Sequence, residues 1–142
     1  MLLAELGDSP DRDRIVKLDY DGSIGRSDGG KEDTIGLLAG SEEAERLMAR
    51  FLDDHEYSPD LSLEKAVSLA AQAWAMGMAI AETNEESEPE EEEISKIDAA
   101  RVLKDHLKTW HVEAAVLERD LPSANKFRLL EDKELRGALK DV

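Results

Sequence analysis

A nearly all-apolar helix is predicted between Leu61 and Glu82, where the sequence reads LSLEKAVSLAAQAWAMGMAIAE. Ser62 is a suitable residue to cap the start of this helix, and Glu64 places a negative charge in its first turn. The polar side chains form only a narrow stripe of Lys65, Ser68 and Gln72. A helix that is apolar on nearly all sides must be covered on more than one side, and its longest apolar run, residues 73–81, is too short to span a bilayer. We therefore predict a buried helix that lies between a sheet and other helices.

The rest of the composition limits what kind of protein surrounds this helix. A chain of 142 residues has room for one domain with a single core, and we expect residues 1–142 to form it. The absence of cysteine excludes disulfides, thiolate metal sites and a cysteine nucleophile, and it suits a reducing compartment. The first ten residues lack the basic segment and the apolar length of a signal peptide. These features predict a soluble cytoplasmic protein, which would also be nuclear in a eukaryote.

The net charge of -16 is unevenly distributed along the chain. Residues 82–93, ETNEESEPEEEE, contain eight glutamates and no basic residue, so they account for half of it. This composition is typical of a solvated loop, which we expect to cover residues 83–95. Because nucleic acids and anionic membranes are polyanions, the charge argues against both as partners.

Strand-like patterns come first along the chain. Leu2 to Leu6 is a short apolar run, and Arg14 to Tyr20 alternates apolar and polar residues, so the two predict an antiparallel hairpin. The polar, glycine-rich Ser23 to Asp33 predicts a loop or a weak edge strand. Thr34 to Ala39, TIGLLA, predicts a buried third strand.

The helical middle of the chain begins at Ser41, which is a good N-cap. One face of the helix that follows carries Ala44, Leu47, Met48, Phe51 and Leu52. A further amphipathic helix is predicted within residues 95–110, with Trp110 closing it against the sheet.

Strands return at the end of the chain, where Val112 to Leu117 and Lys126 to Leu130 predict a second hairpin before a short helix from Glu131 to Leu139. Strands at both ends of a helical middle indicate an α+β fold, an antiparallel sheet with a helical layer packed on one face. The core is expected to contain Leu47, Phe51, Ala70, Trp74, Val112 and Val116.

Five motifs in this order resemble the C-terminal part of a 20S proteasome subunit, the α type more than the β type. They are Asp19-Tyr20-Asp21-Gly22, Gly40-Ser41-Glu42-Glu43-Ala44, Asp60-Leu61-Ser62-Leu63-Glu64-Lys65-Ala66, the strand from His111 to Asp120, and Lys126-Phe127-Arg128-Leu129-Leu130 with Glu131-Asp132-Lys133-Glu134-Leu135. Together they cover nearly the whole chain. The residues between Gly22 and Thr34, the glycine spacing near Gly36 and the acidic run depart from the family pattern.

The resemblance implies half of the α-β-β-α sandwich of these subunits, because the chain begins where the second half of the family's fold begins. Half of the fold would leave one sheet face uncovered, so we expect the chain to oligomerise or to need a complementary N-terminal half. The partners would be other proteasome-like subunits or further copies of the chain. The candidate interface residues are Glu43, Arg46, Arg50 and Trp74.

The resemblance also bears on catalysis, because active members of this N-terminal-nucleophile hydrolase family use an N-terminal threonine. Thr34 follows Asp33 instead of the glycine usual at the self-cleavage point, and cleavage before Thr34 would delete the first hairpin. Asn84-Glu85-Glu86-Ser87 lacks the aspartate and glycine of an element found in catalytic β-type subunits. We therefore expect no peptidase activity.

No cofactor or metal site is predicted either. His106 and His111 cannot share one helix face, and nothing supplies them with further ligands. His55 is expected at a solvated helix end. The run from Glu88 to Glu93 lacks the alternating ligands and the turn glycine of a calcium loop.

Two functions follow from these expectations. The first is a non-catalytic structural subunit, or a fragment of one, that contributes to ring assembly in a proteasome-like particle for protein degradation. The alternative is a stand-alone acidic interaction or assembly factor built on half of the same fold.

Overall fold

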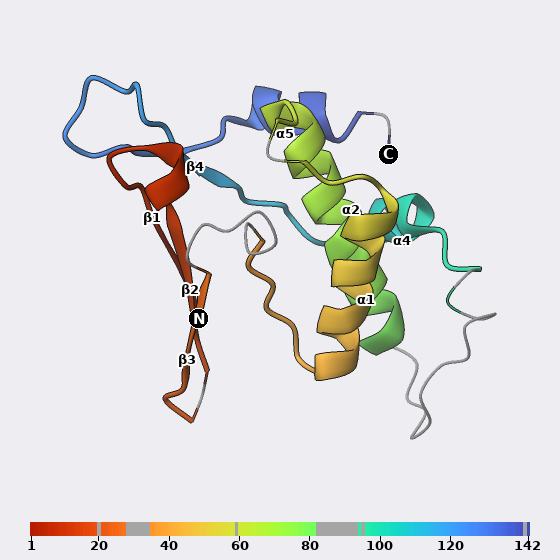
Figure 1. Ribbon diagram of the computed structural model, residues 1–142. Coiled ribbons are helices and arrows are strands. Elements are labelled where there is room, and N and C mark those ends of the chain that lie inside the picture. Colours follow the sequence, from red (N-terminus) through yellow and green to blue (C-terminus); the bar gives the residue numbers. More distant parts are fainter. Residues whose placement is uncertain (20, 28–34, 59, 82–93, 95, 141) are drawn as a thin grey trace. The chain divides into compact units, whose positions relative to one another are not determined.

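The computed structural model describes the chain except for residues 20, 28–34, 59, 82–93, 95 and 141, and Figure 1 shows its helices and strands. In chain order these are β1 (Leu2–Glu5), a 3-10 turn η1 (Pro10–Arg12), β2 (Arg14–Leu18), β3 (Ile24–Ser27), α1 (Glu42–Asp54), α2 (Leu63–Ala81), α4 (Ala99–His106), β4 (Ala115–Leu117), β5 (Phe127–Leu129) and α5 (Asp132–Ala138). Helices and antiparallel strands occupy separate stretches of sequence, so the predicted α+β class is confirmed.

The chain divides into two compact units. The sheet unit consists of Met1–Leu38 and Ala115–Leu129, and the helical unit consists of Ala39–Ala114 and Leu130–Val142. That residues 1–142 form one domain, and that the helices cover one face of the sheet, both stay predictions.

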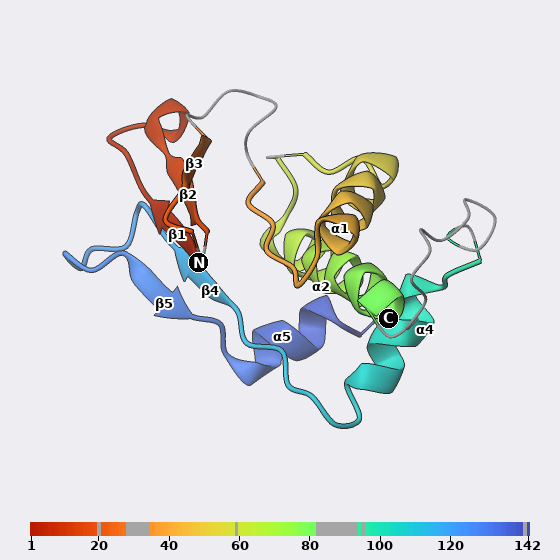
Figure 2. The same ribbon diagram turned by 90° about the horizontal axis from the view of Figure 1, so that it is seen from below.

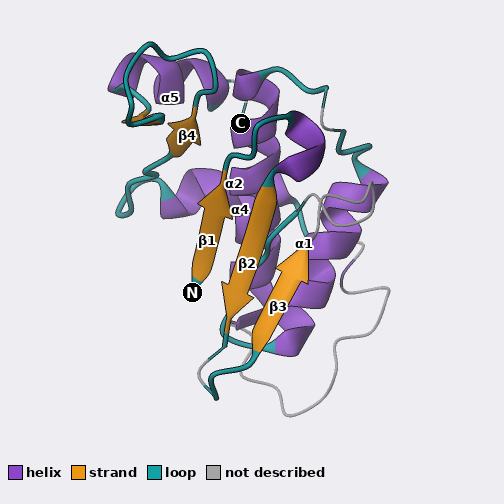
Figure 3. Ribbon diagram, turned by 60° about the vertical axis from the view of Figure 1, so that its left-hand side comes forward, coloured by secondary structure: helices purple, strands orange, loops and turns teal. Residues whose placement is uncertain are grey.

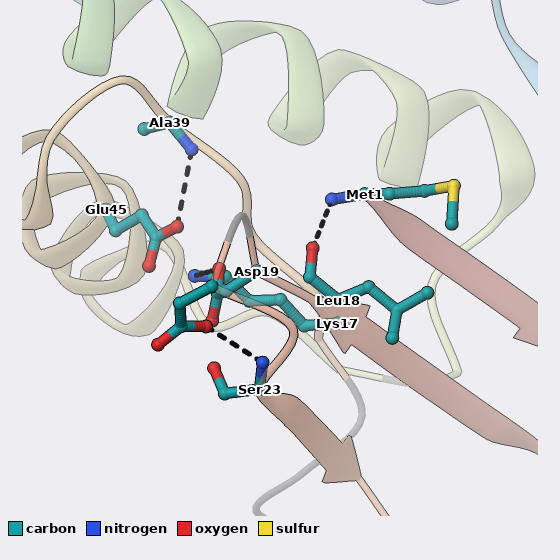
Figure 4. Close-up of polar contacts among 8 residues, drawn as sticks. Met1, Lys17, Leu18, Asp19, Ser23, Ala39 and Glu45 are labelled. Carbon is teal, nitrogen blue, oxygen red and sulfur yellow. Dashed lines mark hydrogen bonds and ion pairs between the residues drawn. The ribbon is translucent and has the colours of Figure 1, made fainter.

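The sheet unit begins with the antiparallel meander β1-β2-β3 (Figure 3). The predicted first hairpin is confirmed, with Leu3 opposite Val16 and Ala4 opposite Ile15. Met1 extends this ladder, because its amino group donates to the Leu18 carbonyl at 2.6 Å and its carbonyl accepts from the Leu18 amide at 2.8 Å (Figure 4).

The turn between β2 and β3 closes at Asp19 and Ser23, where the Asp19 amide donates to the Ser23 carbonyl at 3.1 Å. Gly22 has a φ of 83°, a left-handed conformation that a side chain disfavours. Asp21 completes the turn, since its Oδ1 accepts from the Ser23 amide at 2.8 Å. The sequence Asp21-Gly22 therefore fixes where the chain reverses.

The third strand is not where we expected a buried strand. Ile24–Ser27, expected as a loop or weak edge strand, pairs with β2, with Leu18 opposite Ile24. Residues 35–39 have no strand structure, Leu38 is 47% exposed, and Thr34 lies outside the described residues. The physical reason is that β2 already pairs with β1 and β3 on its two edges, which leaves residues 35–39 no edge of β2 to join.

The second hairpin, β4-β5, has only three residues in each strand. Val116 lies opposite Arg128, and two further backbone bonds extend the ladder: Glu118 donates to Lys126 and Leu130 donates to Ala114, each at 2.8 Å. The structure thus confirms the predicted pairing, with shorter strands. A two-stranded sheet of this length needs other contacts to be stable.

The helical unit is built around α2, as Figure 2 shows for its neighbours α1, α4 and α5. The Ser62 hydroxyl accepts from the Lys65 amide at 3.4 Å, which confirms the predicted start. At Gly77 the helices α1 and α2 come so close that a Cβ atom would lie 2.9 Å from Met48 Sδ. Among the described residues, no helix has the length and apolar character that crossing a membrane requires.

Helix α1 begins as predicted. The Ser41 hydroxyl accepts from the Ala44 amide at 3.2 Å, and the Glu45 carboxylate accepts from the Ala39 amide at 3.3 Å (Figure 4). All five residues predicted for its apolar face are buried.

Helix α4 is shorter than the predicted helix, because Asp98 caps its start by accepting from the Arg101 amide at 3.0 Å. Trp110 lies beyond its end and is 58% exposed, so the prediction that Trp110 closes this helix against the sheet is wrong. The chain ends with α5, whose first turn is held by a capping box of Glu131 and Glu134.

The buried side chains are distributed unequally between the two units. Every buried hydrophobic residue belongs to the helical unit, whereas no described residue of the sheet unit is buried. Of the predicted core residues, Leu47 and Phe51 are buried, and Trp74, Val112 and Val116 are half-buried. Ala70 is exposed, contrary to the prediction, because it lies with the exposed Leu63 on a side of α2 that neither α1 nor α4 covers.

Candidate interaction surfaces

A stripe of charged side chains runs along one face of α1. Glu43, Arg46 and Arg50 follow at spacings of three and four residues, which places them on one face of the helix. Arg46 donates to both Glu43 oxygens, at 3.1 and 2.7 Å, and Arg50 lies 3.8 Å from Asp54. Exposed pairs of this kind add little stability. The stripe is a charged surface on which the Arg46 and Arg50 side chains are 63 and 51% exposed and the Glu43 side chain is 22% exposed.

Trp74, the fourth predicted interface residue, lies elsewhere. It is half-buried and packs against a cluster of Ala71, Ala75 and Leu103 between α2 and α4. Its ring meets His106 edge-on with centroids 5.3 Å apart, and Trp110 lies 6.4 Å away. Trp74 is therefore a packing residue of the α2–α4 contact and is not part of the α1 stripe.

One face of the meander carries apolar side chains that reach solvent, next to the exposed cross-strand pair Glu5 and Arg14. The strand register places Leu3 and Val16 side by side, and Leu18 beside Ile24, on the same face. Leu3 is 48% exposed and Ile24 is 64% exposed. This face combines extended backbone with uncovered apolar side chains, which is typical of a surface that another protein covers.

The second hairpin of the sheet unit also has an apolar face. Ala115 lies opposite Leu129 and Leu117 lies opposite Phe127, so all four point to one side. Phe127 is 48% exposed and Leu129 is 64% exposed. We name this face and that of the meander the apolar strand faces.

Arg119 joins the two segments of the sheet unit. Its Nη2 atom lies 2.6 Å from Asp13 Oδ1, and its Nη1 atom donates to the Gly7 carbonyl. Asp13 Oδ1 also accepts from the Gly7 amide at 2.9 Å. One guanidinium thus ties the β4–β5 connection to the turn between β1 and β2, which lies more than 100 positions earlier in the sequence. Sequence reasoning missed this link, because charged residues in two turns carry no pairing signal.

A cavity of about 420 Å³ lies within the helical unit, between the C-terminal half of α1, α2 and residues 94 and 97–100. Its apolar lining includes Leu47, Phe51, Met76, Ile94 and Ala99, which are all buried. Its polar lining consists of Arg50, Asp54, His55, Gln72 and Asp98. The sequence singled out Arg50 from this group for another reason, and nothing in the sequence indicated a cavity.

His55 stands at the C-terminal end of α1, as predicted. Its Nδ1 lies 2.8 Å from the Phe51 carbonyl oxygen and its ring stacks on Phe51 with centroids 4.0 Å apart. Because a carbonyl oxygen only accepts, Nδ1 carries the hydrogen, and in the neutral ring Nε2 is left as an acceptor.

Several residues weighed for chemistry lie outside the part of the chain that the structure describes. These are Thr34, the stretch Asn84 to Ser87, and the glutamates from Glu88 to Glu93. Among the described residues, His106 ends α4 beside Trp74, whereas His111 is exposed in the following connection.

A scan against protein-family models found no match to this chain, and searches of curated proteins and of solved structures found none either.

Proposed function

We propose that this chain is a non-catalytic structural subunit, or a part of one, in a proteasome-like particle of the cytoplasm, and of the nucleus if the source is eukaryotic. Its role is to contribute to the assembly of a ring from subunits of the same fold. Its partners are other proteasome-like subunits or further copies of this chain.

The apolar strand faces carry this proposal. The sheet unit has no buried residue among those described, yet it exposes Leu3, Ile24, Phe127 and Leu129 by 48 to 64%. Burying apolar area stabilises a protein by roughly 25 cal/mol per Å², so covering these four side chains favours association. The order of the elements adds partial support, because strands, the helices α1, α2 and α4, a hairpin and a short final helix follow one another, although the strand that the resemblance implies before Gly40-Ser41 is not formed in the described residues 35–39.

The proposal assigns no catalytic residue to this chain. An N-terminal-nucleophile enzyme needs a threonine with a free amine beside its hydroxyl. Thr109, the one threonine in the described part of the chain, uses its hydroxyl to cap the end of α4 by donating to the His106 carbonyl at 3.3 Å. We therefore expect the purified chain not to hydrolyse fluorogenic peptides.

Isolation of the tagged full chain from its native cells, followed by native mass spectrometry, tests the proposal. We expect a ring-sized complex that contains other chains of the N-terminal-nucleophile fold or several copies of this one. Recovery of the chain alone, or with unrelated proteins only, would overturn it. Peptide hydrolysis that is lost on substitution of a threonine of this chain would overturn the non-catalytic part.

A stand-alone acidic interaction factor is the second candidate. The observation that favours it is the exposed charged stripe on α1 together with the eight glutamates of residues 82–93. In that case the isolated complex would contain one copy of this chain and a basic partner of another fold.

A further inference from the structure

The cavity between α1, α2 and residues 94 and 97–100 is open on one side and has the volume of a small-ligand site. An engineered apolar cavity of about 150 Å³ holds one benzene molecule. At about 420 Å³ this cavity has room for a fused pair of aromatic rings with a short substituent. The buried Leu47, Phe51 and Met76 give such rings an apolar wall.

The charges around the cavity favour a cation. Two carboxylates, Asp54 and Asp98, line it together with one guanidinium, Arg50. Arg50 lies 3.8 Å from Asp54, and the remaining carboxylate, Asp98, binds the Arg101 amide at 3.0 Å. Among the described residues that line the cavity, carboxylates therefore outnumber guanidinium groups by one.

His55 adds a directional group to this lining. Its Nδ1 donates to the Phe51 carbonyl oxygen at 2.8 Å. In the neutral ring, Nε2 can therefore accept a hydrogen bond from an ammonium or amidinium N–H. An anion would meet two carboxylates and this acceptor. A cationic group is complementary to all three.

We propose that this cavity is a binding site for a small aromatic cation, a fused apolar ring system that carries an ammonium or amidinium group. The site does not depend on the subunit role proposed above, because every residue in it belongs to the helical unit.

Tryptamine and indole-3-acetate form a matched pair of probes, since they share the indole ring and differ in charge. Each is titrated into the ¹⁵N-labelled full chain at neutral pH while amide shifts are recorded. Tryptamine should saturably shift the amides of Phe51, Met76 and Ala99, and its dissociation constant should be at least about fivefold smaller than that of indole-3-acetate.

Substitutions then test the cause of this preference. In the double variant Asp54→Asn and Asp98→Asn, asparagine keeps a cap acceptor at residue 98, so α4 should remain folded while the preference for tryptamine falls about fivefold or more. Asp105→Asn is the matched control, because Asp105 is exposed, pairs with Lys108 and does not line the cavity. This control should keep the preference.

Filling the cavity tests the location of the site. Ala100 is half-buried in its wall, and Ala100→Trp should abolish the shifts while the dispersion of the remaining spectrum is kept. The proposal is overturned if neither probe shifts these amides, if indole-3-acetate binds as tightly as tryptamine, or if a folded Ala100→Trp variant still binds tryptamine.

Discussion

Arg119 is the residue on which the cohesion of the sheet unit depends most visibly. Its guanidinium contacts Asp13 at 2.6 Å and the Gly7 carbonyl, and the two ends of the ion pair are about one-third exposed, at 32 and 39%. The hairpin that it holds has strands of three residues, which are marginal on their own. A partly shielded, charge-assisted contact at this point stabilises the hairpin more than an exposed pair would.

Replacing this residue should loosen the hairpin. We expect Arg119→Ala to lower the free energy of unfolding by about 1 kcal/mol, with partial screening taken into account. Hydrogen exchange should quicken at the Gly7 amide, which shares Asp13 with Arg119. The matched control is Arg12→Ala, because Arg12 pairs with Asp8 at 3.7 Å with both side chains mostly exposed. Equal effects of the two substitutions in urea unfolding would contradict the role of Arg119.

Asp21 should give the turn between β2 and β3 a dependence on pH. The pKa of Asp21 is lowered from its ordinary value of 3.8, first because its carboxylate accepts from the Ser23 backbone amide and then from the Ser23 side chain. A depressed folded-state pKa contributes stability that is fully present above pH 3.8 and is lost as the pH falls through the lower folded value.

The ¹³C shift of the Asp21 carboxyl group should therefore titrate below pH 3.8, with the Ser23 amide following it. Asp21→Asn keeps an acceptor without the charge, so the Ser23 amide should lose this titration. A carboxyl that titrates at or above 3.8 would rule out the bond as the cause.

At the level of elements, the close contact of α1 and α2 organises the helical unit. Gly77 allows this contact, because a Cβ atom there would lie 2.9 Å from Met48 Sδ and 3.1 Å from Met48 Cγ. Buried Met48, Leu47 and Phe51 then fill the space along α1. The apolar helix α2 is thus covered by α1, and Gly77 is the residue of α2 at which the two helices lie close together.

Gly77→Val should separate these helices. Overpacking of this kind costs about 1–3 kcal/mol, and we expect urea unfolding to show a loss in that range. Met48→Ala in the same chain removes the clashing atoms. The double variant should therefore lose less free energy of unfolding than the two single variants lose in sum. Strict additivity would show that the close approach at Gly77 does not limit the packing.

Several elements could be predicted from the sequence because local signals defined them. Ser41 and Ser62 marked helix starts, a short apolar run marked β1, and the alternation of apolar and polar residues marked β2. For Ile24–Ser27 the sequence left a loop and a weak edge strand open, because IGRS has no alternating pattern, and the structure shows the edge strand paired with β2. Ala70 was misplaced because a helix that is apolar all round gives no indication of which side remains uncovered.

The candidate surfaces were also predictable from the sequence only where a local pattern defined them. Glu43, Arg46 and Arg50 were interface candidates from the family resemblance, and the structure has them on one face of α1. The Arg119 contact and the cavity arise from segments that are distant in sequence, and no local pattern marks either of them. The exposure of Ile24 and Leu129 likewise depends on tertiary structure alone.

At the level of the whole molecule, the two units differ in where their apolar side chains lie. The helical unit holds every buried hydrophobic residue, and the sheet unit holds the apolar strand faces. A net charge of -16 opposes non-specific contact between copies of the chain. We propose that association uses a specific apolar surface, and that the apolar strand faces are this surface.

Light scattering on the purified full chain at micromolar concentration tests this account most directly. The account predicts a mass above the 15.8 kDa of one chain, and it predicts that Ile24→Lys with Leu129→Lys lowers this mass. The matched control, Leu63→Lys on α2, places the same charge at a residue that is 40% exposed and should leave the mass unchanged. A monodisperse monomer of the unsubstituted chain would contradict the account.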